Sequence, residues 1–334
     1  MHTFIEKDNI VCTQHKATND EKPPVLLKNN KFTKLFEPIG NLFSLPAYSE
    51  IDLTIFFAPF FVLFFGFCLG DMGYGVVYLI LGTLLKLKIK GKMRTFLTLM
   101  QIFGISTIII GFISGTLFGM TMADLPYFSK VKDLFLDQNQ LLNLALAIGF
   151  VQIVFGMGVN VYKHVIFTGW LSALSKVGWI ILLFSLLDIL ITKSFPQLSG
   201  ITVWIGVGLI VFFGSPKDGW LKSLGTGLVD LYNITGVAGD LLSYIRLFAL
   251  GVSSAILGLV VNSLALSAKG VPYIGVILFV LTLIVGHGAN LMLSSLSAFV
   301  HPMRLTFVEF YKNTGFLGGG KPYKPLAKEG SNEE

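Results

Sequence analysis

Long apolar runs separated by short polar breaks fill the chain after about residue 50. Runs long enough to cross about 30 Å of hydrocarbon are expected to be transmembrane helices. Eight runs meet this requirement, at approximately residues 53–69, 72–87, 95–121, 139–161, 173–192, 199–214, 227–267 and 272–313. The pattern therefore predicts an all-α fold, a polytopic membrane bundle of about eight transmembrane helices.

The last two runs are much longer than the others. Each has about 40 residues, so a helix rising about 1.5 Å per residue would reach about 60 Å. This length is about twice the thickness of the hydrocarbon layer. We therefore expect both helices to be long and strongly tilted, or to extend beyond the bilayer.

The polar ends divide the chain into three parts. Residues 1–50 hold charges, Asn and a Pro-Pro pair without a long apolar run, which predicts a short cytoplasmic segment. Residues 51–314 form the predicted membrane domain, and residues 315–334 the predicted cytoplasmic C-terminal tail.

The distribution of charge predicts the partner and the orientation. Only 13% of the residues are charged, against about 25% in soluble domains, and 53% are hydrophobic. The net charge is +6, but the basic residues lie between the apolar runs and form no single patch. We therefore expect a lipid bilayer as partner and no nucleic acid. With the N-terminus inside and eight crossings, nineteen Lys and Arg residues fall inside and four outside. This asymmetry predicts that both termini are cytoplasmic.

Three glycines, Gly111, Gly115 and Gly119, follow one another at intervals of four residues in the third run. This spacing lets helix backbones approach closely. It fits tight packing within one bundle, with homodimerisation as the alternative.

A single arginine, Arg246, interrupts the seventh apolar run. A guanidinium in hydrocarbon costs about 2.5–3.5 kcal/mol or more, and it cannot avoid this cost by losing its proton. At about 100° per residue, Ser243 and Ser253 lie near its helix face, whereas Asp240 is too far round for a neutralising pair. The position predicts a water-filled cavity, a carboxylate partner from elsewhere or an ion path. Snorkelling or bonding to carbonyl groups is the structural alternative.

The eighth run carries a polar stripe about 100° wide on an otherwise apolar helix. Imidazole, amide and hydroxyl groups aligned in this way suit a wet path or a proton relay. Hydrogen bonding between neighbouring helices is the alternative. The stripe consists of His287, Asn290, Ser294, Ser297, His301 and Arg304.

Enzyme and cofactor motifs are absent from the sequence. It contains no Ser/His/Asp array, metal-ligand cluster or dinucleotide fingerprint, so we expect no cofactor and no metal. Gly315 to Lys321 has the spacing of a phosphate loop, but Pro322 stands where Ser or Thr is required. We therefore expect no nucleotide site.

Three blocks carry a family resemblance. The first runs from Tyr48 to Gly75, the second is Leu242-Ser-Tyr-Ile-Arg-Leu-Phe-Ala-Leu250, and the third joins Phe299-Val-His-Pro-Met-Arg304 to a tail ending at Pro325. In their order and spacing they resemble the membrane half of subunit a of the rotary V-type and A-type ATPases, called subunit I in bacteria.

The resemblance implies a stator of the bacterial plasma membrane whose two long helices pack against a rotating proteolipid ring. Arg246 would be the family's essential arginine and Arg304 a supporting second one. The stripe from His287 to His301 would border one of two aqueous half-channels, and Glu309 would lie near the cytoplasmic mouth. The subunit would couple H⁺ or Na⁺ flux to rotation without binding ATP.

Two features depart from the family pattern. Ser253 and Ser294 stand where some relatives have a histidine and an acidic residue. Residues 1–50 stand in place of a large cytosolic half, so peripheral-stalk and central-stalk partners are expected only where that half is supplied.

Two other classes of function stay open on the sequence. One is a self-contained secondary transporter or channel that uses Arg246 as an anion site. The other is a non-conducting membrane anchor or assembly scaffold. H⁺ and Na⁺ are not distinguished, because the selective carboxylate of the family belongs to the ring.

Overall fold

The computed structural model describes residues 23–48, 50–91, 93–124, 126, 134–167, 169–189, 193, 195–214 and 220–323. The expected N-terminal segment and C-terminal tail therefore lie partly outside the described residues. Helices dominate the described part, which confirms the all-α class. They are α2 (Glu37–Phe43), α3 (Thr54–Leu69), α4 (Met72–Lys88), α5 (Met93–Ser114), α6 (Gln138–Phe167), α7 (Trp170–Leu187), α8 (Pro196–Phe212), α9 (Trp220–Tyr232), α10 (Ile234–Leu242), α11 (Ile245–Lys269), α12 (Gly275–Arg304) and α13 (Tyr311–Asn313).

Four two-residue strands form two small pairs. β2 (Thr116–Leu117) and β3 (Met120–Thr121) make an antiparallel hairpin. β1 (Pro24–Val25) and β4 (Lys321–Pro322) pair in parallel, so segments from the two ends of the chain lie side by side.

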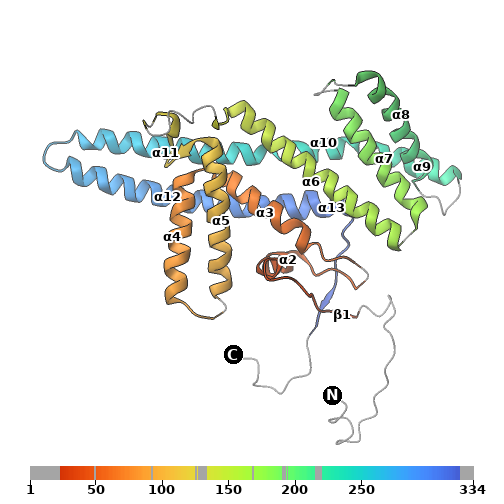
Figure 1. The fold of residues 1–334 in the computed structure, drawn as a ribbon, viewed down its shortest axis with the longest axis horizontal. Helices are drawn as coiled ribbons and strands as arrows, with labels where there is room; N and C mark the ends of the chain where they lie inside the picture. Colours follow the sequence, from red (N-terminus) through yellow and green to blue (C-terminus); the bar gives the residue numbers. More distant parts are fainter. Residues whose placement is uncertain are drawn as a thin grey trace, which may run out of the picture.

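The helices are arranged as two crossing hairpins and a group at one end (Figure 1). α11 and α12 form a long hairpin along the longest axis of the molecule, and the α4–α5 hairpin runs across it. α3 packs against α5, α11 and α12 at the crossing, and α6 to α9 follow one another at the other end.

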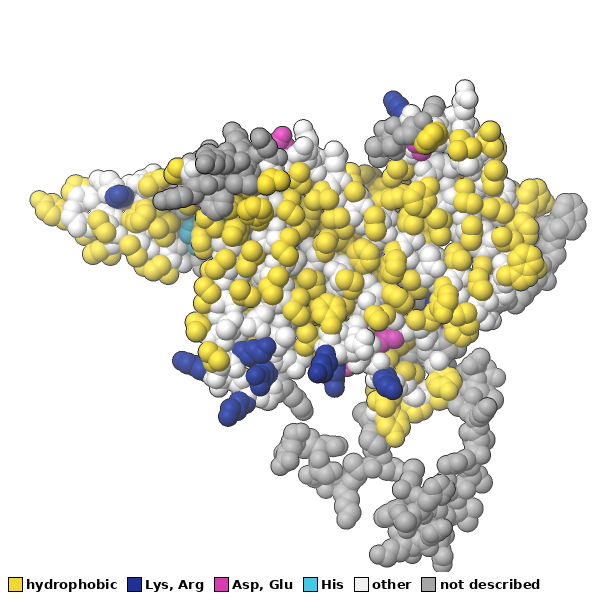
Figure 2. Space-filling view, viewed as in Figure 1, with side chains coloured by type: hydrophobic (Ala, Val, Ile, Leu, Met, Phe, Trp, Pro, Cys, Tyr) yellow, Lys and Arg dark blue, Asp and Glu magenta, His cyan; other side chains and the backbone are white. Residues whose placement is uncertain are grey.

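Within the described residues, five helical stretches are long and apolar enough to cross a membrane: Met93–Ser114, Gln138–Phe167, Trp170–Leu187, Lys222–Lys269 and Gly275–Asn313. Two further apolar helices, Thr54–Leu69 and Gln197–Phe212, are shorter. The predicted count of eight is therefore not confirmed. Hydrophobic side chains cover the sides of the molecule, and basic ones gather where the α4–α5 hairpin turns (Figure 2).

The predicted third helix, 95–121, was too long. It ends at Ser114, because Gly115 and Gly119 adopt left-handed backbone conformations with φ of 68° and 72°. The residues from 116 to 121 form the β2–β3 hairpin instead.

One buried carboxylate holds this hairpin in place. Asp71 caps α4 by accepting hydrogen bonds from the backbone N–H groups of Gly73 (2.8 Å) and Tyr74 (3.2 Å). It also accepts from Phe118 (2.9 Å) and Gly119 (2.7 Å) in the hairpin. Asp71 is fully buried, so these four bonds compensate for the loss of its hydration.

The glycines allow close approach within the chain. A Cβ on Gly111 would lie 2.1 Å from the Met72 nitrogen, and one on Gly119 would lie 2.3 Å from the Gly258 carbonyl carbon. These contacts are the packing expected within one bundle, although Gly115 and Gly119 act outside the helix in which the spacing was recognised.

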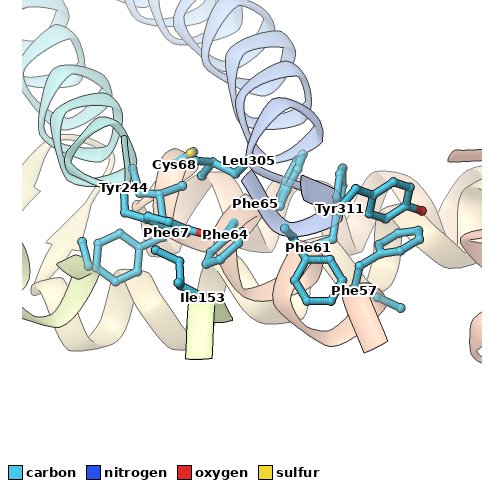
Figure 3. Packing of buried hydrophobic residues seen from close by; sticks show 14 of the residues in the cluster. Phe57, Phe61, Phe64, Phe65, Phe67, Cys68, Ile153, Tyr244, Leu305 and Tyr311 are labelled. Carbon is cyan, nitrogen blue, oxygen red and sulfur yellow. The ribbon is translucent and has the colours of Figure 1, made fainter. Parts of the chain in front are cut away.

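The core is built from the aromatic side chains of α3. Phe57, Phe61 and Phe64 are fully buried, and Tyr244 and Leu305, which directly precede α11 and follow α12, pack with them (Figure 3). The hydrophobic centre therefore lies where α3 meets the segments that flank the α11–α12 hairpin.

Glu50 clamps the two ends of the described chain together. Its carboxylate accepts from the backbone of Leu317 (2.8 Å) and Gly318 (2.9 Å), and it pairs with Lys163 of α6 at 3.1 Å. The clamp lies beside the β1–β4 pair, so the C-terminal loop is fixed against the segment that leads into α3.

We expect Gly111→Ala to destabilise the protein by about 1–3 kcal/mol, because the new methyl group has no room against Met72. Gly158 of α6 has open space around its Cβ position, so Gly158→Ala is the matched control and should be neutral or stabilising by up to about 1 kcal/mol. Thermal unfolding in detergent measures both. Equal stability of the two variants would contradict the close approach of α5 to the start of α4.

Burial alone would raise the pKa of Glu50, but hydrogen bonds from Leu317, Gly318, Ala47 and Lys163 outweigh it and hold this pKa below its usual value. A lowered pKa stabilises the fold above the unfolded-state value of about 4.3. This stabilisation is lost as the pH falls through the folded-state value.

We therefore expect Glu50→Gln to lower the unfolding temperature at pH 7, and the difference from the wild type to shrink as the pH falls below about 4. Glu37→Gln is the control, because Glu37 accepts a hydrogen bond from the Asn29 amide and contacts no C-terminal residue among the bonds described. A difference that stays constant with pH would count against the clamp.

Candidate functional site

Arg246 lies just after a break in the seventh predicted helix. The stretch Lys222–Lys269 is 48 residues long, but it consists of α9, α10 and α11 in succession. Between α10 and α11 the backbone tightens, with hydrogen bonds from Tyr244 to Leu241 (3.2 Å) and from Leu247 to Tyr244 (3.0 Å). The predicted long helical stretch is therefore present, but short breaks divide it, and Arg246 is in the first turn of α11.

The guanidinium of Arg246 is only partly satisfied by the protein. The residue is half-buried, and its Nη1 atom is buried without a hydrogen-bond partner among the described residues. Its charge acts on Cys68, His301 and Glu309. A cation with a free donor in such a place is poised to attract an anionic group.

Glu309 approaches from the other long helix. Beyond Arg304 the helix widens into a π-helical segment, Leu305–Phe310, which carries Glu309 inward until it is 2% exposed. Its Oε2 atom has no hydrogen-bond partner in the described part, while Arg246, Arg304 and the Ser243 hydroxyl act on its charge. π-helical turns are frequent at functional sites.

The structure therefore brings the residues around Arg246 together with one end of the polar stripe predicted on the eighth run. Ser243, Arg246, His301, Arg304 and Glu309 form one electrostatic cluster where the α10–α11 break meets the π-helical segment. Arg304 itself is exposed, and His301 and Ser297 are half-buried. Asp240 does not pair with Arg246, as expected, but with Lys312 at 3.0 Å.

The N-terminal half of the polar stripe, from His287 to Ser294, forms hydrogen bonds within the protein. Asn290 donates to the hydroxyl of Tyr74 (2.8 Å) and to the carbonyl of Ser254 (3.0 Å), and Ser294 donates to Asn290 (3.0 Å). His287 bonds Tyr74 through Nδ1 at 2.9 Å. His287 and Asn290 thus bond to neighbouring helices, as in the alternative interpretation, whereas the bond of Ser294 lies within α12.

Several residues of this network were not recognised from the sequence. Asn262 bonds His287 Nε2 at 3.0 Å and donates to the Phe118 carbonyl at 2.7 Å. Gln152, fully buried in α6, accepts from the Tyr244 hydroxyl at 2.6 Å. A lone Gln or Asn in an apolar run was the available signal, because such a residue needs a partner inside the protein.

An exposed apolar face extends from the charged cluster. On α11 the residues Ser253, Leu257, Val260 and Leu264 repeat on the face of Arg246, and all are exposed. On α12, Leu293, Leu296 and Val300 are exposed on the face that ends at Arg304. Ser253 is therefore a surface residue of this face and takes no part in the His287–Asn290 network.

Metal chemistry finds no support in the described part of the chain, where no three His, Cys, Asp or Glu residues gather closely enough to hold an ion. Of the two carboxylates at the cluster, Asp240 pairs with Lys312, and Glu309 lies in the field of Arg246 and Arg304.

The fold and this cluster define a polytopic α-helical membrane protein with an incompletely paired arginine beside a buried carboxylate. The V-type ATPase 116kDa subunit family matches residues 3–121. The chain is also 31% identical to V-type ATP synthase subunit I of Borreliella burgdorferi, over 91% of its own length and 54% of that protein.

Archaeal relatives are equally similar. The chain is 33% identical to A-type ATP synthase subunit I of Methanothermobacter thermautotrophicus, over 94% of its length and 47% of that protein. It is 30% identical to the same subunit of Methanocaldococcus jannaschii, over 92% of its own length and 49% of that protein. The chain is therefore similar to the V-type ATPase 116kDa subunit family and to subunit I proteins of V-type and A-type ATP synthases, and it spans about half the length of these curated relatives.

We expect Tyr74→Phe to destabilise the protein by about 1–3 kcal/mol, because buried groups of His287 and Asn290 lose their shared partner. Tyr162→Phe is the matched control, since Tyr162 is 59% exposed. Thermal unfolding in detergent compares the two. If both variants unfold at the wild-type temperature, the network contributes nothing to stability.

Proposed function

We propose that this chain is a stator of a rotary ATPase or ATP synthase, which forms two ion half-channels against a proteolipid ring and couples H⁺ or Na⁺ flux to rotation. The observation that carries the proposal is the guanidinium of Arg246, held with a buried donor free at the head of an exposed apolar face. Similarity to the V-type ATPase 116kDa subunit family and to subunit I supports it.

The electrostatics suit a partner that brings its own carboxylate. A permanent cation attracts a ring carboxylate and favours release of its proton or sodium ion. Arg246 keeps its charge under burial, whereas a lysine would lose its proton more readily and would form a weaker barrier between the half-channels. A titrating residue at this position would let ions leak without rotation.

The apolar face of α11 and α12 is the proposed ring contact. Its exposed residues need a hydrophobic partner, which lipid and a ring of apolar helices both provide. We assign Arg246, Arg304 and Ser253 to this contact, because Arg304 and Ser253 interrupt the exposed face.

The remaining polar residues are assigned to the two ion paths. Glu309 and Ser243 border the path on the side of the α10–α11 break, and Ser297 and His301 border the other. We propose that His287, Asn290 and Ser294 hold the wall of that second path, since their side chains are already bonded within the protein.

The same proposal sets the place of the protein in the cell. We propose a bacterial plasma membrane, with the basic turn of the α4–α5 hairpin and both termini on the cytoplasmic side. The α11–α12 hairpin crosses the direction of the α4–α5 hairpin, so α11 and α12 would be strongly tilted in that membrane. Stalk subunits would contact the cytosolic part that the longer relatives carry.

The decisive test is Arg246→Ala in the assembled complex reconstituted in liposomes. We expect ATP-driven ion pumping to be abolished while the proteolipid ring still copurifies, because the substitution removes the cation and leaves the apolar contact. Arg246→Lys should also be severely impaired.

Arg94→Ala is the matched control, since Arg94 is exposed near the α4–α5 turn and far from the cluster in sequence. It should pump at the wild-type rate. Undiminished pumping by Arg246→Ala would reject the coupling role. Solute transport by the chain alone, without a ring, would favour a self-contained carrier.

A further inference from the structure

An ion pair joins the two segments that flank the charged cluster. Lys312 of α13 donates to both carboxylate oxygens of Asp240 in α10, at 3.1 and 3.0 Å. Asn313 adds a longer contact to the same carboxylate at 3.4 Å and donates to the backbone carbonyl of Glu309 at 2.7 Å. One group of side chains therefore links the α10 backbone to the turn that carries Glu309.

The Asp240–Lys312 pair joins the two segments that carry Arg246 and Glu309. α10 leads directly into the break that precedes Arg246, and α13 directly follows the π-helical segment that carries Glu309. Tyr244, inside the break, lies within electrostatic range of both Asp240 and Glu309. Asp240 and Lys312 thus bridge the two helices on one side of the cluster.

Other contacts hold the α13 side of this link in a fixed position. Asn160 of α6 donates to the Asn313 carbonyl at 3.1 Å, and Lys163 donates to the Gly315 carbonyl at 2.7 Å. The α13 end is therefore anchored to α6, and its hold on α10 passes through Asp240.

A cavity of about 210 Å³ opens beside the pair, and Lys176, Trp179, Asp230, Asn233, Lys312 and Asn313 are among its lining residues. The Lys312 side chain is 55% exposed, whereas the Asp240 side chain is only 12% exposed. Loss of the lysine would leave a largely buried carboxylate short of a partner, so α10 would shift to hydrate it. The two residues should therefore act as a unit.

We propose that Asp240 and Lys312 are positioning residues for ion transfer, which hold the α10–α11 break and the π-helical segment at the separation that Arg246 and Glu309 require. This inference rests on the proposed stator function. The pair touches neither the exposed apolar face nor the ring contact assigned above, so it acts through the geometry of the cluster.

The test measures ions pumped per ATP hydrolysed by the assembled complex in liposomes, together with copurification of the ring. We expect Lys312→Met to lower this ratio roughly fivefold with the ring retained, and Lys312→Arg to restore it. The double variant Asp240→Asn with Lys312→Met should be no worse than Lys312→Met alone, because the buried charge is then removed as well.

Lys176→Met is the matched control, since it removes another lysine from the same cavity and leaves the pair intact. An unchanged ratio in Lys312→Met, an equal loss in Lys176→Met, or loss of the ring from Lys312→Met would each overturn the inference. Arg246→Ala is run beside them: if it abolishes pumping while Lys312→Met does not, the stator function stands and the positioning role fails.

Discussion

Polar groups inside an apolar protein must find partners within the chain, and this requirement organises the molecule. Asp71 illustrates how fully it is met, with four backbone N–H groups around one carboxylate. Among the described residues, buried polar side-chain atoms without a partner belong to Gln152, His164, Ser175, Arg246, Ser254, Thr306 and Glu309. Arg246 lies directly after the α10–α11 break, and Thr306 and Glu309 lie in the π-helical segment, so three of these seven residues belong to the candidate site; the others lie in α6, α7 and α11. Departures of this kind are expected where a protein gives up stability for function.

The division between satisfied and unsatisfied groups separates two roles within one polar stripe. His287 and Asn290 are held by Tyr74, Asn262 and the Ser254 carbonyl, which ties α12 to α4 and α11, and Ser294 donates to Asn290 within α12. Further along the same helix, His301 and Arg304 enter the field of Arg246. A rigid half and a charged half of one helix therefore follow each other without a change in periodicity.

The sequence was sufficient for the class of fold, and it singled out Arg246 as the centre of the candidate site. Apolar runs locate most helices, and a lone arginine in such a run identifies Arg246 because few side chains are so costly in hydrocarbon. The break before Arg246 could not be predicted, because Leu241 to Leu247 reads as uninterrupted helix and the change is one of hydrogen-bond spacing. The partners of the stripe were missed for another reason. Tyr74 lies 213 residues from His287, and periodicity within a helix carries no information about a distant neighbour.

The π-helical segment Leu305–Phe310 has a consequence for comparing this chain with its relatives. A π turn accommodates one residue more than an α turn, so the side chains beyond it are rotated by about 100° from an α-helical extrapolation. In a homologue that lacks one residue here, the equivalents of Tyr311 and Asn313 would lie on a different side of the helix even if the amino acids were identical. A single-residue gap at this point of an alignment should accordingly be treated as a change of helix phase, with the residues on its two sides aligned as separate blocks.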